Sequence, residues 1–192
     1  LTFFFAPYFA TVAADYFGAS GMEIEASTAK AQTMWSICLS ASGLFIGISA
    51  PILGAIADTS GRRMPWIYVF SIMLIVGALG TWVGVPDGSN LTLMLYFFAL
   101  GYIGTEFALI FTNAQLTTLG NQNEIGKISG SGFGFGYLGG VFALAIALLF
   151  LVEQPNGTTF MLGIQPLFGF LNPENMEGTR FVGPLAAIWF IV

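Results

Sequence analysis

Charged residues, histidine and cysteine are scarce in this chain, and each shortage excludes a class of protein. Of the 192 residues only 8% are charged, whereas an ordinary soluble domain carries roughly 25%. Because a folded protein needs charged surface to stay in water, this composition excludes a soluble enzyme. With no histidine and one cysteine, Cys38, the chain forms no internal disulfide and offers no zinc site of the usual type. We expect neither a metal ion nor a cofactor.

Basic residues are scarcer than acidic ones. Five lysines and arginines stand against ten aspartates and glutamates, a net charge of −5. A nucleic-acid-binding protein needs a basic face, so nucleic acid is excluded as a partner. No histidine pair, aspartate pair or serine–lysine pair lies at helical spacing within the apolar stretches, which argues against an enzyme embedded in a membrane.

Long apolar runs dominate what is present. Apolar residues make up 56% of the chain and the mean hydropathy is +0.81. A helix needs about 20 apolar residues to cross ~30 Å of hydrocarbon, and these runs are continuous rather than alternating as in a barrel. We predict an all-α protein whose first partner is the lipid bilayer. Its six spans cover residues 1–17, 33–57, 65–85, 91–113, 133–152 and 181–192.

Both ends of the sequence lie inside apolar runs. The first residue is a leucine within such a run, and the last run, 181–192, is too short to span. These two features predict that the chain is one transmembrane bundle truncated at both ends, a fragment of a longer membrane protein.

The sharpest local pattern joins the second and third predicted spans. Gly54, Asp58, Gly61, Arg62 and Arg63 follow the spacing G-x-x-x-D-x-x-G-R-R. This pattern resembles the loop between helices two and three of the major facilitator superfamily of transporters. The resemblance implies a gating role for these five residues and places the loop in the cytoplasm.

A second block narrows the resemblance. Asn113 is the last residue of the fourth predicted span and Ala114 follows it, and residues 126–140 read GKISGSGFGFGYLGG. This block is similar to the vacuole-effluxer-like branch of the superfamily, whose members export amino acids. The resemblance implies the first six of twelve helices, with the missing C-terminal half as a partner. It also implies an inner (plasma) membrane location in a bacterium or a vacuolar one in a fungus.

The glycines of that block have two readings. Gly134, Gly136 and Gly139 form a literal G-x-G-x-x-G, but a membrane span follows them, so a dinucleotide site is excluded by context. Gly132, Gly136 and Gly140 recur every four residues and form a small stripe on one helix face. We expect this stripe, together with Gly139, to permit close helix packing.

Glu106 is the one acid well inside a predicted span. A carboxylate there costs roughly 2.5–3.5 kcal/mol unless it faces water or a partner. Two interpretations follow: Glu106, with Asn113, binds solute or a coupling proton, or Glu106 forms a structural ion pair with Arg62, Arg63 or Lys127.

These observations predict a secondary active transporter. Two similar bundles would rock about a site near the membrane midplane and move a small polar solute, with amino acids the class that the resemblance implies. The alternative is a six-span homodimeric channel or a structural membrane subunit.

Overall fold

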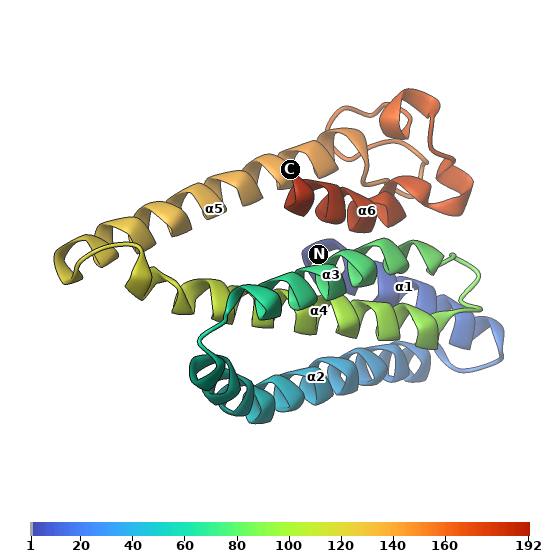
Figure 1. Cartoon of the computed structure of the whole chain (residues 1–192). Coiled ribbons are helices and arrows are strands. Elements are labelled where there is room, and N and C mark those ends of the chain that lie inside the picture. The colour runs from blue at the N-terminus through green and yellow to red at the C-terminus, as the bar shows by residue number, and fades with distance from the viewer. Residues whose placement is uncertain (1) are drawn as a thin grey trace.

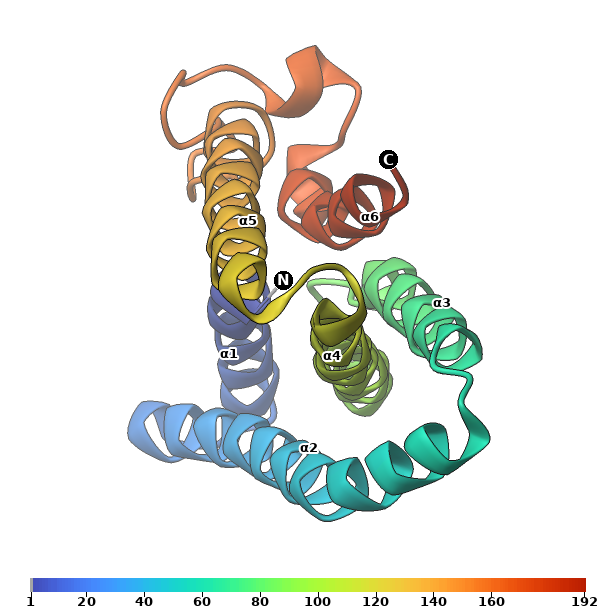
Figure 2. The same ribbon diagram turned by 60° about the vertical axis from the view of Figure 1, so that its left-hand side comes forward.

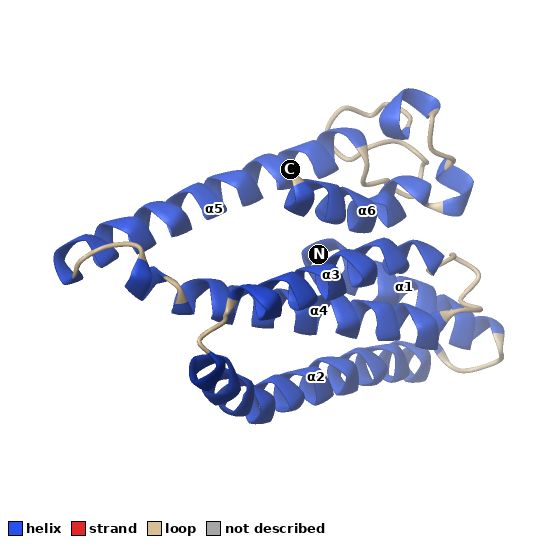
Figure 3. Cartoon of the chain, in the orientation of Figure 1, coloured by secondary structure: helices blue, strands red, loops and turns tan. Residues whose placement is uncertain are grey.

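The computed structural model describes residues 2–192, the side chains of residues 60, 117, 122 and 123 excepted. Within that range the chain is all-α, as predicted, and no strand forms beyond an isolated bridge between Glu153 and Thr159 (Figures 1 and 3). Short 3-10 turns η1 (Thr81–Val83), η2 (Leu116–Thr118), η3 (Pro166–Gly169) and η4 (Pro173–Asn175) interrupt the connections. The main helices are α1 (Thr2–Ala19), α2 (Ile24–Ser60), α3 (Met64–Gly80), α4 (Leu91–Ala114), α5 (Gln122–Phe150) and α6 (Glu177–Ile191).

Within the described residues, four helical segments are long and apolar enough to cross a membrane: Ile24–Thr59, Met64–Val83, Leu91–Ala114 and Glu124–Phe150. α1, with 18 residues, and α6, with 15, are not among them. Leu1, the first residue of the first predicted span, lies outside the described residues.

Two helices begin well before the apolar runs that they carry. α2 starts at Ile24 and α5 at Gln122, before the predicted spans 33–57 and 133–152. Residues 24–32 read IEASTAKAQ, and alanine, glutamate, lysine and glutamine all favour helix. The polar residues therefore extend the helix rather than end it.

Aromatic side chains pack α4 against its neighbours. Phe5 of α1 stacks on Phe98 of α4 with ring centroids 5.5 Å apart, and Phe98 is fully buried. Toward the other end of α4, Phe107 stacks on Phe70 of α3 at 4.6 Å. Figure 2 shows α4 enclosed by α1, α2 and α3. α4 is therefore the central element of this bundle.

Glycines set the distance between α3 and α4. A Cβ atom on Gly77 would collide with the backbone of Gly101, and one on Gly104 would meet the backbone of Leu74. The two helices approach this closely because Gly77, Gly101 and Gly104 carry no side chain. The sequence pattern predicts a further set of packing glycines on α5: Gly132, Gly136, Gly139 and Gly140.

α2 and α5 bury little of their apolar surface. In the 18-residue apolar window of each helix, 6% is buried within the chain. α2 has 37 residues and contains Pro51, and Figure 2 shows it curving around the bundle. α5 contacts mainly α6 and η2 and diverges from α4 (Figure 1). Such large apolar faces suit contact with lipid or with further helices.

Candidate functional site

The turn between α2 and α3 lies at the same end of the bundle as the end of α4 and the start of α5 (Figure 1). Gly61 closes α2 in the left-handed conformation, with φ 64°, and its N–H donates to the carbonyl of Asp58. Only a residue without Cβ adopts this φ at little cost, so Gly61 lets the chain reverse within three residues. Asp58 and Arg63 are thereby brought face to face.

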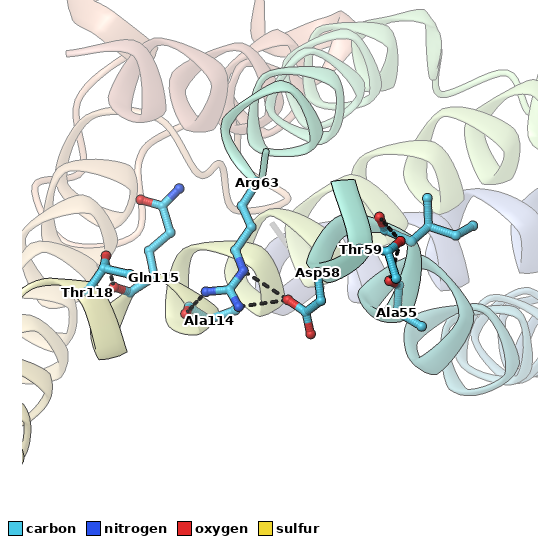
Figure 4. Close-up of polar contacts among 8 residues, drawn as sticks. Ala55, Asp58, Thr59, Arg63, Ala114, Gln115 and Thr118 are labelled. Atoms are coloured by element: carbon cyan, nitrogen blue, oxygen red, sulfur yellow. Dashed lines mark hydrogen bonds and ion pairs between the residues drawn. The ribbon is translucent and has the colours of Figure 1, made fainter. Parts of the chain in front are cut away.

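Arg63 connects α2 to α4. Its Nε and Nη2 donate to Oδ1 of Asp58 at 3.1 and 2.7 Å, while Nη1 donates to the main-chain carbonyl of Ala114 at 2.6 Å. Figure 4 shows the guanidinium lying between the two acceptors. We call Asp58, Arg63 and the Ala114 carbonyl the clamp.

Both charges of the clamp lie at the unfavourable ends of their own helices. Asp58 is in the last turn of α2, where the helix dipole is negative, and Arg63 precedes the first residue of α3, where it is positive. Each is compensated by the other, and Arg63 also by the carbonyl end of α4. The charges are therefore stabilised mainly by contacts between elements.

An open pocket of about 590 Å³ surrounds the clamp. Four of the five motif residues line it: Asp58, Gly61, Arg62 and Arg63. Gln115, which directly follows α4, lines it as well. The fifth, Gly54, lies one turn earlier on α2, and a Cβ there would meet nothing within 4 Å. The structure thus brings the charged part of the motif together and leaves Gly54 outside.

Glu106 and Asn113 lie on α4 and do not line the clamp pocket. Glu106 is half-buried, and among the described residues no hydrogen bond or ion pair reaches its carboxylate. Arg63, one of its expected partners, is engaged by Asp58 and Ala114 instead. Asn113 lines a second pocket between α4 and α5.

The predicted packing glycines of α5 divide between that second pocket and open space. Gly132 and Gly136 line it, and a Cβ on Gly132, Gly136 or Gly140 would meet nothing within 4 Å. A Cβ atom on Gly139 would lie 3.8 Å from Nε1 of Trp189, an ordinary van der Waals distance. Within the described part of the chain, then, no helix packs closely on this stripe, and its packing role stays a prediction.

A second set of contacts, which the sequence pattern did not predict, lies at the opposite end of the bundle. Arg180 is 9% exposed, donates to the carbonyl of Trp82 from Nη2 at 2.6 Å and lies over the Trp82 ring. The hydroxyl of Tyr8 donates to the carbonyl of Gly84 at 2.7 Å. A single arginine opening an apolar run was the available signal.

Two carboxylates organise the loops at that end. Glu153 accepts hydrogen bonds from the backbone N–H groups of Gly178 and Thr179 at 2.9 and 3.0 Å, so it caps α6 from a distant segment. In the loop between α3 and α4, the N–H and hydroxyl of Ser89 donate to Asp87 and hold the pKa of that carboxyl below its usual range.

Sequence comparison connects the chain to a transporter. It is 25% identical over 140 residues to a protein named uncharacterized MFS-type transporter YxiO from Bacillus subtilis (strain 168). The match covers 72% of this chain and 32% of that protein, so the chain spans about a third of the length of this relative. No family profile and no solved structure matches the chain. Together with the four membrane-length helices, the similarity supports a multi-pass membrane protein related to MFS-type transporters.

Proposed function

We propose that the chain forms one bundle of a secondary active transporter that moves small polar solutes by alternating access. The observation that carries this proposal is the similarity to an MFS-type transporter over 72% of the chain. The nearly unburied apolar windows of α2 and α5 support it, since a second bundle would cover part of these faces. The second bundle would come from a longer chain, and the inner membrane of a bacterium is the location we propose.

The clamp would act as the gate of this transporter. A surface ion pair contributes only about 0–1 kcal/mol, so the pair of Asp58, 61% exposed, and Arg63 can open at small cost. Opening leaves each charge at the unfavourable end of its helix, which favours a new partner. A second bundle that offers such partners would let Asp58 and Arg63 alternate between two sets of contacts, as alternating access requires.

The test is solute flux in proteoliposomes. The longer chain that the proposal requires is reconstituted beside the 192-residue chain, and exchange of a panel of radiolabelled amino acids is measured. We expect saturable exchange from the longer chain, and insertion without flux from the 192-residue chain. Saturable flux from the 192-residue chain, with a stable dimer in detergent, would instead establish the six-span homodimer.

A further inference from the structure

The connection between α5 and α6 exposes large apolar side chains. From Gln154 to Pro173 it carries no charged residue, and Figure 2 shows it on the side of α5 and α6 that faces away from α2. Exposed apolar side chains that gather in one segment mark contact with another protein or with a membrane. Five of them, each between 49% and 85% exposed, form what we call the apolar rim: Phe160, Met161, Leu162, Phe168 and Phe170.

Backbone contacts place the first half of the rim beside the last turn of α5. The N–H of Met161 donates to the carbonyl of Leu148 at 3.3 Å, and the N–H of Phe160 donates to the carbonyl of Val152 at 3.0 Å. Leu148 belongs to the membrane-length segment Glu124–Phe150, which ends two residues later. This half of the rim therefore folds back to the level of the last residues of the span.

The second half of the rim lies at the same level. The ring of Phe168 contacts the ring of Phe150, the last residue of α5, with centroids 5.7 Å apart. Leu167 and Phe168 have φ angles of 47° and 59°, which large side chains rarely adopt. With this backbone Leu167 packs against the buried cluster between α5 and α6, while Phe168 is strongly exposed. The local conformation thus directs an aromatic side chain outward.

The connection also satisfies backbone groups internally, as a segment in contact with lipid must. Thr159 is fully buried, its N–H donates to the carbonyl of Ile164 at 2.7 Å, and its carbonyl accepts from the N–H of Gly163 at 3.1 Å. The N–H groups of Phe168 and Phe170 donate to carbonyls of the same connection. Because an unpaired backbone group is costly away from water, these closed turns suit the boundary between headgroups and acyl chains.

We propose that the apolar rim is a membrane anchor, which inserts into the bilayer surface at the end of the bundle opposite the clamp. The rim continues the nearly unburied apolar surface of α5 at the end of its span, which favours lipid over a protein partner. Since no lysine or arginine lies between Gln154 and Pro173, the anchor binds through apolar area and needs no anionic lipid. This inference depends on the membrane location of α5 and not on transport.

Spin labels measure which surroundings each position meets. The longer chain is reconstituted in phosphatidylcholine nanodiscs with its cysteines, Cys38 among them, replaced by serine. A nitroxide is attached in Phe160→Cys, Phe168→Cys or Phe170→Cys, and in the control Glu174→Cys, an exposed acidic position of the same connection. Collisions with oxygen, which concentrates in lipid, are compared with collisions with a nickel chelate that stays in water. We expect oxygen to dominate at the three aromatic positions and the nickel chelate to dominate at position 174.

Three results would overturn the anchor. Frequent collision with the nickel chelate at the aromatic positions would place the rim in water. Rare collision with both reagents would show that protein covers the rim, either a second bundle or a second copy of the chain. Adding phosphatidylglycerol to the nanodiscs should leave the preference for oxygen unchanged, and a preference that appears only with this anionic lipid would contradict an apolar anchor.

The unmodified protein offers a second test, which no substitution can disturb. Met161 in the rim and Met64 at the clamp pocket are 61% and 51% exposed on the protein. Periodate, a charged oxidant, converts methionine in water to the sulfoxide, and peptide mass spectrometry measures the rate at each residue. In nanodiscs, which leave both bilayer surfaces open to water, Met64 should be oxidised severalfold faster than Met161. Equal rates would overturn the proposal.

Discussion

Arg63 binds Asp58 and the carbonyl of Ala114 with opposite sides of one guanidinium, at 2.7 and 2.6 Å. The three groups come from the end of α2, the start of α3 and the end of α4 (Figure 4). A planar group with five donors in a fixed arrangement can hold both acceptors at once, and an ammonium group cannot match that geometry. The relationship makes Arg63 the central residue of the clamp.

Removing the charge of Asp58 should impair transport more than folding. In Asp58→Asn the amide replaces the charged acceptor of Arg63, and we expect transport to fall by tenfold or more while the unfolding midpoint in detergent falls by less than about 4 °C. Flux in proteoliposomes and a thermal melt measure the two effects. Arg63→Lys, which keeps the charge without the fork, should lie between Asp58→Asn and the unmodified protein. Normal flux in both variants would contradict the gating role.

Substituting a packing glycine between α3 and α4 should destabilise the bundle. Gly77→Ala places a methyl group against the backbone of Gly101, and overpacking of this kind costs about 1–3 kcal/mol. Gly136→Ala is the matched control, since its Cβ would meet nothing within 4 Å. Melting of the 192-residue chain in detergent should show a lower midpoint for the first variant and not for the second.

The same control tests the glycine stripe of α5. If Gly132, Gly136 and Gly140 pack against a second bundle, Gly136→Ala should reduce flux in the full transporter while leaving the 192-residue chain as stable as before. Unchanged flux in the full transporter would remove the packing role of the stripe.

Arg180 should matter for stability more than its place in a loop-to-helix junction suggests. Arg180→Ala removes two hydrogen bonds to the Trp82 carbonyl and the contact with the Trp82 ring. Hydrogen bonds to charged groups contribute roughly 1.5–3 kcal/mol, so the melting midpoint should fall clearly. Lys127→Ala, which removes an exposed basic residue, should leave it unchanged. Equal midpoints for the two variants would show that Arg180 adds nothing to the junction of α3 and α6.

Asp87 should contribute a pH-dependent effect of small size. Its pKa is lowered by hydrogen bonds from Ser89, so its stabilising contribution is present above the usual aspartate range and is lost as pH falls through the lower folded-state pKa. Ser89→Ala removes the hydroxyl donor and should lower the melting midpoint slightly at pH 7. The difference should vanish in strong acid, where the carboxyl is neutral in both proteins. A difference that grows as pH falls would contradict the assignment.

The residue pattern was sufficient to predict the all-α class, the membrane and the turn that carries the clamp. Long charge-free runs have few alternatives to helices in lipid, because backbone groups there must bond within their own segment. Gly61, between Asp58 and Arg63, is a local signal for the turn, because only the backbone of glycine adopts the required φ freely.

Only the tertiary structure decided which residues meet. Sequence spacing could not show that Arg63 binds the Ala114 carbonyl at the end of α4 rather than Glu106. It could not show that Gly77 and Gly101 let α3 and α4 pack closely, or connect Arg180 to Trp82, 98 positions away. These contacts depend on how each helix is rotated and tilted against its neighbours. In this chain the apolar pattern says little about that rotation, because lipid-facing and buried faces are alike in hydrophobicity.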